Sequence, residues 1–206
     1  TVMPGTEIEF KNGGGLIVSN NFFAPGTESH PIRIFSRDSS SNGLTILQGD
    51  MAYFRHVSFE GLSNLNYKNW ELTGAVTVYE THTVFKNCTI SNTYAEDALN
   101  VIRSDVQLDE LILQGTNSDG LDLDFCTGKI ESCEFKNTGN DCVDISGSTI
   151  GMYNSKVSNS GDKGISAGEG SYLFLENITI DQVEIGIAAK DGSEVIGSDV
   201  YVSRAK

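Results

Sequence analysis

The sequence predicts an all-β protein folded as a right-handed parallel β-helix, a solenoid with coils of about 22 residues. Three observations lead to this fold class. Similar segments recur at a constant spacing, apolar residues within them alternate with polar ones, and no helical period competes. Units this short contain no crossover helix, so their parallel strands must be joined by turns that wind round a common core.

The repeat is visible when related six-residue segments are aligned. The step between successive segments is 22 residues, and TGAVTV (73–78) fits one turn earlier with a step of 23. The aligned segments are EDALNV (96–101), SDGLDL (118–123), NDCVDI (140–145), DKGISA (162–167) and EIGIAA (184–189). Six segments in register indicate a structural repeat.

Each segment has the two-residue period of a half-buried strand. Leu121 and Leu123 alternate with polar residues, and Val143 and Ile145 do the same one unit later. Every unit then carries a second apolar stretch, bounded by Gly, Asn, Ser and Thr turns. Examples are LDELIL (108–113), IESCEF (130–135) and YNSKV (153–157). We therefore expect two or three strands per coil.

The chain is expected to form one continuous domain with two parts. Residues 73–206 form the regular 22-residue coils, and residues 1–72 form irregular N-terminal coils. The strand signals of residues 1–72 are EIEF, GLIVS, PIRIF, GLTIL and AYFRHVSFEGL. Because both ends of the sequence lie in strand-like patterns, we expect the chain to be a fragment of a larger protein with further domains.

Composition excludes several functional classes. With 28 acidic and 14 basic residues the net charge is −14, which opposes binding to nucleic acid and to anionic membranes. No apolar run reaches the length needed to span a membrane. The four cysteines lack the spacing of a disulfide framework or a zinc site, so we expect buried free thiols.

The solenoid gathers acidic side chains from different coils. Neighbouring coils stack about 4.8 Å apart, so residues at equivalent positions are spatial neighbours. Alternation directs Asp122 and Asp124 outward, and Asp144 follows Asp122 one coil later. Asp97, Asp119 and Asp141 form a second column, which we call the turn column because it lies at the turn before each of these strands. We call the resulting set of six carboxylates the acidic patch: Asp97, Asp119, Asp122, Asp124, Asp141 and Asp144.

Carboxylates so close together repel one another, and three arrangements relieve the repulsion. The patch could bind Ca²⁺, which takes six to eight oxygen ligands, so all six aspartates are candidate metal ligands. A carboxyl could instead stay protonated and act as a general acid beside an ionised partner. In the structural alternative, the aspartates bind backbone amides at turns. The sequence leaves these alternatives open.

Two lysines border the acidic patch. Lys163 takes the place of Asp in the turn column, one coil beyond Asp141, and Lys190 lies in the column of Asp124. Each could form an ordinary surface ion pair. Alternatively, a lysine beside carboxylates and a metal could abstract the proton α to a uronate carboxylate.

Four segments resemble successive motifs of polygalacturonases. The segments NSDGLD, GNDCVDI, GDKGISAGE and AAKD stand where that family has Asn-Thr-Asp, Gly-Asp-Asp-Cys, Gly-His-Gly and Arg-Ile-Lys. The resemblance implies Asp119 and Asp141 as catalytic acid or base, and Lys190 as a ligand of the sugar carboxylate. Asn140 replaces the expected first Asp of the pair, and Lys163 replaces the expected histidine. These departures argue against an active polygalacturonase.

The Asp-x-x-Asp pattern also resembles the calcium sites of β-helix pectate and alginate lyases. That resemblance assigns Asp119, Asp122, Asp141 and Asp144 to the metal and Lys163 to the catalytic base. The segments MPGTEIEF and GGGLIVSNNFFAPGTESHPIRIF are similar to the first coils of secreted bacterial β-helix repeat proteins of the pectin-lyase-like superfamily. The resemblance implies a secreted or cell-surface protein whose partner is a polysaccharide, expected to be acidic.

Three functions are therefore consistent with the sequence. The first is an extracellular lyase, epimerase or hydrolase that acts on an acidic glycan along the outward strand face. The second is a non-catalytic module that binds glycan or Ca²⁺ within a larger surface protein. The third is a structural stalk, which we disfavour because the outward acids cluster in the middle coils. Aromatic residues near the patch offer stacking surfaces for sugars: Tyr67, Trp70, Tyr79 and Tyr94.

Overall fold

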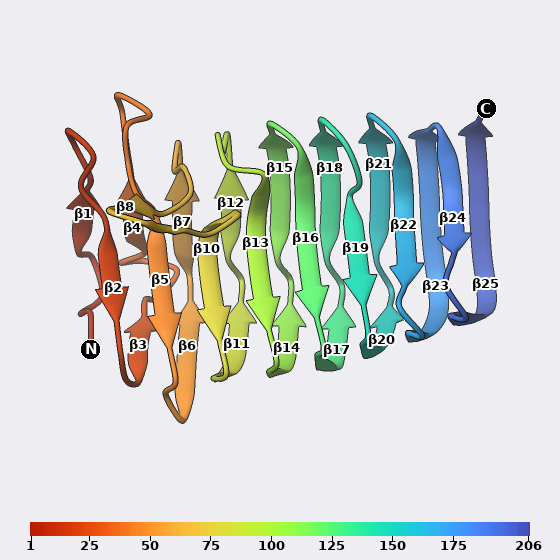
Figure 1. Ribbon diagram of the computed structural model, residues 1–206, viewed down its shortest axis with the longest axis horizontal. Coiled ribbons are helices and arrows are strands. Elements are labelled where there is room, and N and C mark those ends of the chain that lie inside the picture. The colour runs from red at the N-terminus through yellow and green to blue at the C-terminus, as the bar shows by residue number, and fades with distance from the viewer.

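The computed structural model describes residues 1–206 and is a parallel β-solenoid of about nine turns of roughly 23 residues (Figure 1). All regular elements are β-strands, so the predicted all-β class is confirmed. The structure has no helix long and apolar enough to cross a membrane. In Figure 1 the coils stack along the long axis, with the N-terminus at one end and the C-terminus at the other.

Each regular coil contains three strands, one on each of three faces. Face 1 is an eight-stranded parallel sheet. Its strands are β2 (Leu16–Val18), β5 (Leu44–Leu47), β10 (Gly74–Tyr79), β13 (Asp97–Ile102), β16 (Asp119–Asp124), β19 (Val143–Ser146), β22 (Lys163–Gly168) and β24 (Ile185–Ala189).

Faces 2 and 3 belong to one sheet because the long strand β23 (Tyr172–Val183) bridges them, and β25 (Glu194–Ala205) pairs along β23. Face 2 holds β3 (Phe22–Pro25), β6 (Met51–Arg55), β11 (His82–Lys86), β14 (Asp105–Asp109), β17 (Thr127–Glu131) and β20 (Thr149–Tyr153). Face 3 holds β1 (Glu7–Glu9), β4 (Ile32–Phe35), β7 (Val57–Glu60), β12 (Thr89–Ser91), β15 (Ile112–Thr116), β18 (Glu134–Thr138) and β21 (Lys156–Ser160).

Residues in the left-handed backbone region turn the chain at the corners between faces. One coil turns at Arg103 (φ 52°) and Glu110 (φ 51°), and Gly115 (φ 67°) bends the end of β15 before the third corner. Glycine takes this conformation without strain, whereas the other residues are held in it by the strand pairing on either side. The corners let three short strands wind round one core.

On face 1 the step between coils is constant only from β13 onward. Leu99, Leu121 and Val143 pair in register at steps of 22 residues. By contrast, Leu44 pairs with Val76, a step of 32 residues. The extra residues form a strap, residues 62–72, which contains the antiparallel strands β8 (Asn66–Tyr67) and β9 (Trp70–Glu71). In Figure 1 the strap crosses in front of face 1 at its N-terminal coils.

Inward-facing apolar side chains fill the solenoid in layers. Phe54 lies at the centre of an aromatic stack, with ring centroids 4.4 Å from Phe85 and 5.5 Å from Phe22. All four cysteines are buried and free, as expected from their spacing. Because this core is continuous from coil to coil, the outward side chains of face 1 are held on a rigid, regularly spaced surface.

Candidate functional site

The acidic patch follows three consecutive coils of face 1, with its members on β13 and β16 and on or just before β19. Asn100 pairs with Asp122, which in turn pairs with Asp144. Asp97 pairs with Asp119 at the start of the strands. The predicted columns are therefore confirmed, and carboxylates from three coils share one surface.

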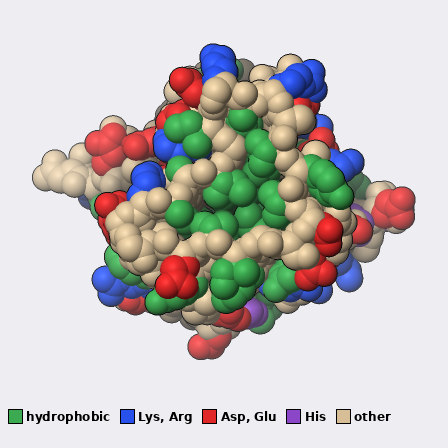
Figure 2. Space-filling model, turned by 90° about the vertical axis from the view of Figure 1, so that its right-hand side faces the viewer, with side chains coloured by type: hydrophobic (Ala, Val, Ile, Leu, Met, Phe, Trp, Pro, Cys, Tyr) green, Lys and Arg blue, Asp and Glu red, His purple; other side chains and the backbone are tan.

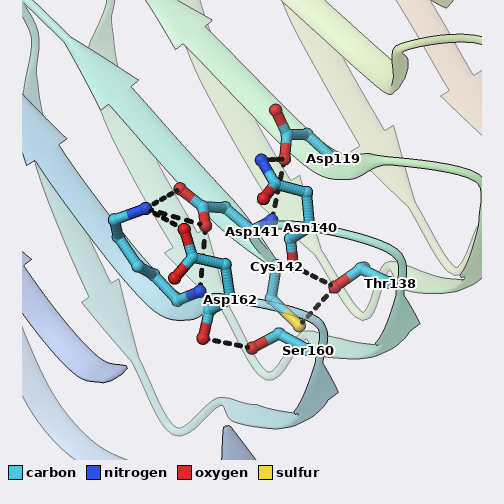
Figure 3. A network of polar contacts seen from close by, with 8 residues as sticks. Asp119, Thr138, Asn140, Asp141, Cys142, Ser160 and Asp162 are labelled. Carbon is cyan, nitrogen blue, oxygen red and sulfur yellow. Dashed lines mark hydrogen bonds and ion pairs between the residues drawn. The ribbon is translucent and has the colours of Figure 1, made fainter. Parts of the chain in front are cut away.

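Two aspartates of the turn column are bound to the backbone of the next coil (Figure 3). The Asp119 carboxylate accepts hydrogen bonds from the backbone N–H of Asp141 and from the Asn140 amide, each at 2.7 Å. Asp141 accepts the backbone N–H of Lys163 at 2.9 Å. The structural alternative thus describes these two side chains well, and Asn140 supplies a donor where the polygalacturonase motif has an acid.

Lys163 is held as a cation. Its Nζ lies 3.4 Å from the Asp141 carboxylate, which is almost fully buried, and it contacts the Asp162 carboxylate. The hydrogen bond with Asp162 and the charge of Asp141 raise the pKa of Lys163, although desolvation opposes the rise. A base needs a neutral amine, and this environment favours the ammonium form. Lys190 is exposed, forms no ion pair, and lies three coils from Asp124 in their shared column.

Asp122 carries the most perturbed carboxyl group of the patch. Burial raises its pKa to about 9, and the nearby charges of Asp97 and Asp124 add to the rise. The Asn100 side-chain amide donates to Asp122 Oδ2 at 2.9 Å and to Asp124 Oδ2 at 3.3 Å. Burial also raises the pKa of Asp124, and the Asn100 hydrogen bond partly opposes this rise. The pair therefore shares one donor, and Asp122 holds a proton at neutral pH.

Asp97 is deeply buried, with 3% of its surface exposed. Its Oδ2 atom has no hydrogen-bond partner. Burial raises the pKa of Asp97 to about 7; a hydrogen bond with Thr73 opposes the rise and the charge of Asp119 adds to it. Asp97 is therefore a second carboxyl group that can hold a proton near neutral pH.

The patch does not present a preformed metal site. No group of three or more His, Cys, Asp or Glu side chains in residues 1–206 is arranged to hold a metal ion. Asp119 and Asp141 already accept hydrogen bonds, and Asp122 is protonated at neutral pH, whereas Ca²⁺ requires several free anionic oxygens. The side chains as arranged here do not fit a calcium site. Calcium binding by the patch therefore stays a prediction.

Exposed aromatic side chains lie on the strap, N-terminal to the patch along the solenoid, where Tyr67 lines a hollow with Gly13, Ile17 and Asn42. The strap leads into Thr73, whose carbonyl accepts the backbone N–H of Asp97 at 3.1 Å. Within the strap, Trp70 is 42% exposed and Tyr67 is 52% exposed. Exposed aromatic rings beside a row of hydrogen-bonding groups form a surface on which sugars can stack.

A family comparison agrees with this architecture. The model of the family described as "right handed beta helix region" matches residues 97–206, more than half of the chain. The chain belongs to this family. Membership shows a right-handed β-helix and confirms the predicted fold class. It does not assign this β-helix protein to the polygalacturonases or the lyases.

Other comparisons add little about function. No curated protein matches this β-helix protein. Among solved structures it is similar to a GH136 lacto-N-biosidase from Eubacterium ramulus, with 10% sequence identity and a TM-score of 0.30. The similarity covers 97% of this chain and 50% of that chain, so the β-helix protein spans about half the length of its structural neighbour. A similarity this low carries no argument about activity.

The sequence did not reveal the hydrogen-bonding roles within the patch. The position of Asn100 as the shared donor of Asp122 and Asp124 depends on side-chain geometry. The contact of Lys163 with Asp162 was also missed, although the adjacency of the two residues was a usable signal. The structure brings Asp119, Asp141 and Lys163 together and leaves Lys190 apart.

Proposed function

We propose that this β-helix protein is an extracellular polysaccharide-active protein that hydrolyses glycosidic bonds on the outward side of face 1. The observation that carries this proposal is the pair Asp122 and Asp124, whose carboxyl groups share the Asn100 amide, with Asp122 protonated at neutral pH. Glycoside hydrolysis depends on two carboxyl groups of this kind, one protonated and one ionised.

In the proposed reaction Asp122 donates its proton to the glycosidic oxygen as the C–O bond breaks. Asp124 stabilises the positive charge that develops on the sugar, and water supplies the hydroxyl group that completes hydrolysis. After the reaction Asp122 recovers a proton from that water. Because both Oδ2 atoms accept from one nitrogen, at 2.9 and 3.3 Å, the two carboxyl groups are held close together.

Hydrolysis fits the patch better than β-elimination. A lyase needs a neutral base, and Lys163 is held as an ammonium between Asp141 and Asp162. The predicted acidic glycan would also meet like charge at the patch. We therefore propose that a neutral stretch of polysaccharide lies against the patch, with Tyr67 and Trp70 as stacking surfaces.

A non-catalytic binding module is the second candidate. Asp119 and Asp141 favour it because their carboxylates accept backbone N–H groups. Asn140 and Lys163 also favour it because they stand where the polygalacturonase motifs have Asp and His. In such a module the same surface would bind sugar hydroxyl groups without cleaving the chain.

A reducing-end assay on a panel of neutral and acidic polysaccharides tests the proposal, with binding measured in parallel by affinity electrophoresis. We expect new reducing ends from a neutral polysaccharide, and at least a hundredfold loss of rate in Asp122→Asn. The matched control is Asp50→Asn, since Asp50 is exposed and lies outside the patch. Binding without cleavage would favour the module, and the absence of both would refute the proposal.

A further inference from the structure

A second polar groove lies at the corner between faces 3 and 1 in the N-terminal coils, and no residue of the acidic patch lines it. Its volume of about 490 Å³ is within the range of small-molecule sites. The side chains that define it come from three coils: Arg33, Phe35, Arg37, Glu60, Asn92 and Tyr94.

A stack of two guanidinium groups on one aromatic ring forms one wall of the groove. Phe35 points outward from β4 yet is only 5% exposed, because arginine side chains cover it. The guanidinium carbon of Arg33 lies 4.8 Å from the ring centroid, and that of Arg37 lies 4.9 Å away. Stacking restricts both side chains and presents their N–H groups in fixed directions.

The charges of this wall are balanced by neighbouring glutamates. Arg33 pairs with Glu7 at 2.8 Å and with Glu60 at 3.8 Å, and Arg37 pairs with Glu9 at 3.1 Å. Each guanidinium has five N–H donors, so donors remain after these pairs form. The groove therefore offers donors and acceptors side by side and has no large excess of positive charge.

The opposite wall adds an exposed aromatic ring. Tyr94 is 55% exposed, and its backbone N–H donates to the Leu62 carbonyl at 2.8 Å, which fixes it beside the strap. A smaller hollow of about 200 Å³ shares Asn92 and Tyr94 with the groove and continues to Asn117 in the next coil. The two hollows together form an elongated polar channel along the corner.

We infer that this corner groove is a binding site for neutral sugar units of a glycan chain. A sugar presents hydroxyl groups that both donate and accept, together with an apolar ring face. Paired arginines and glutamates match the hydroxyl groups, and the Tyr94 ring matches the apolar face. An anionic ligand would instead need guanidinium groups without carboxylate partners. The inference rests on the groove alone and does not depend on the chemistry proposed for Asp122.

Isothermal titration calorimetry tests the inference with five probes: cellohexaose, xylohexaose, mannohexaose, N-acetylchitohexaose and hexagalacturonate. We expect at least one neutral hexaose to bind the wild-type protein, and its affinity to fall at least tenfold in Arg37→Gln and in Tyr94→Ala. Tyr94→Phe keeps the ring and should bind nearly as well as wild type. Arg103→Gln is the matched control, because Arg103 lies over the exposed Phe125 ring at a different corner.

Three results would overturn the inference. These are the absence of binding by every neutral hexaose, full affinity in both Arg37→Gln and Tyr94→Ala, and salt-sensitive binding of hexagalacturonate alone. Asp122→Asn separates this site from the proposed function. A variant that loses cleavage and keeps the affinity of the corner groove supports two distinct sites, whereas joint loss would place the sugar on the patch instead.

Discussion

Four carboxyl groups of the acidic patch fall into two physical classes. Asp119 and Asp141 use their charge to accept backbone N–H groups from the next coil. Asp97 and Asp122 are buried beside other acids and have pKa values raised to about 7 and about 9. The first class stabilises the stacking of coils, and the second class holds protons at neutral pH.

The protonation of Asp122 predicts a pH-dependent stability. Its folded pKa of about 9 exceeds the value of about 3.9 for aspartate in an unfolded chain, so folding is favoured when the proton is bound. This contribution is complete below about pH 4 and is lost as the pH rises through about 9, by up to about 1.4 kcal/mol per pH unit. Asp122→Asn stays neutral, so we expect its melting temperature to exceed that of wild type at pH 9.

The two proteins should melt at similar temperatures at pH 4, where wild-type Asp122 is fully protonated. Differential scanning calorimetry between pH 4 and pH 9 measures the difference. Asp50→Asn provides the control and should keep the wild-type pH dependence, because Asp50 is exposed and outside the patch. A parallel pH dependence in wild type and Asp122→Asn would contradict the assigned protonation.

Lys163 and Lys190, the two lysines expected to border the patch, should differ sharply in their effect on stability. Lys163→Met leaves the buried Asp141 carboxylate without its cation, and we expect a loss of about 1–3 kcal/mol in the free energy of unfolding. Lys190→Met removes an exposed cation that has no partner, so its effect should stay within about 0.5 kcal/mol. Urea denaturation distinguishes them, and equal effects would argue against a structural role for Lys163.

Sequence periodicity predicted the positions of these side chains but not their chemical states. The 22-residue step was enough to place Asp122 between Asn100 and Asp144. Which acid holds a proton depends on burial and on the rotamer of Asn100, and neither follows from spacing. The same limit explains why spacing alone did not decide whether Lys163 forms an ion pair or acts as a base, although its adjacency to Asp162 favoured the pair.

At the scale of elements, hydroxyl side chains connect successive coils inside one corner. The backbone N–H of Cys126 donates to Ser148 Oγ at 2.7 Å, and that of Ser148 donates to Ser171 Oγ at 3.1 Å. All three residues are buried. The corner therefore satisfies its buried N–H groups through side chains of the following coil, where no strand ladder can reach them.

Removing one hydroxyl from this series should destabilise the protein. Ser148→Ala leaves the buried N–H of Cys126 without an acceptor, and we expect a loss of about 1–3 kcal/mol in the free energy of unfolding. Ser158→Ala is the matched control, since its side chain forms no hydrogen bond in the structure and lies partly exposed on β21. Guanidinium denaturation of both variants measures the difference. A cost below that of Ser158→Ala would show that water or a shifted backbone satisfies Cys126.

The regular elements were predictable from the sequence, and the irregular ones were not. A constant step exposes the alternation in β13, β16, β19 and β22. In the N-terminal coils the step from Leu44 to Val76 is 32 residues, and the added strap hides the period. The hairpin of β8 and β9 pairs only with itself, so no repeat in the sequence could indicate it.

At the scale of the whole molecule, the solenoid is least covered at its C-terminal end. Figure 2 shows hydrophobic side chains filling the middle of this end. Val202 pairs in register with the fully buried Ile180 but is itself 48% exposed, because β25 pairs with β23 alone. In a solenoid each coil is stabilised mainly by its neighbours, so a strand with one neighbour is less stable than a strand with two.

Hydrogen exchange should reveal this gradient. We expect backbone amides of β25 to exchange at least tenfold faster than those of β20, which is paired on both sides. Mass spectrometry of peptic peptides, with protection compared coil by coil, provides the measurement. Uniform protection along the whole chain would indicate a single cooperative unit and contradict the expectation.

The equal steps in the second half of the chain also bear on how such a protein can change during evolution. Units of identical length are interchangeable, because loss or duplication of one 22-residue unit keeps every later strand in register. Removal of residues 119–140, for example, would place Asp141 at the position of Asp119, one coil after Asp97 in the same column. Copy number could therefore lengthen or shorten the acidic surface without redesigning any coil, whereas the N-terminal coils, with their unequal steps and strap, permit no such exchange.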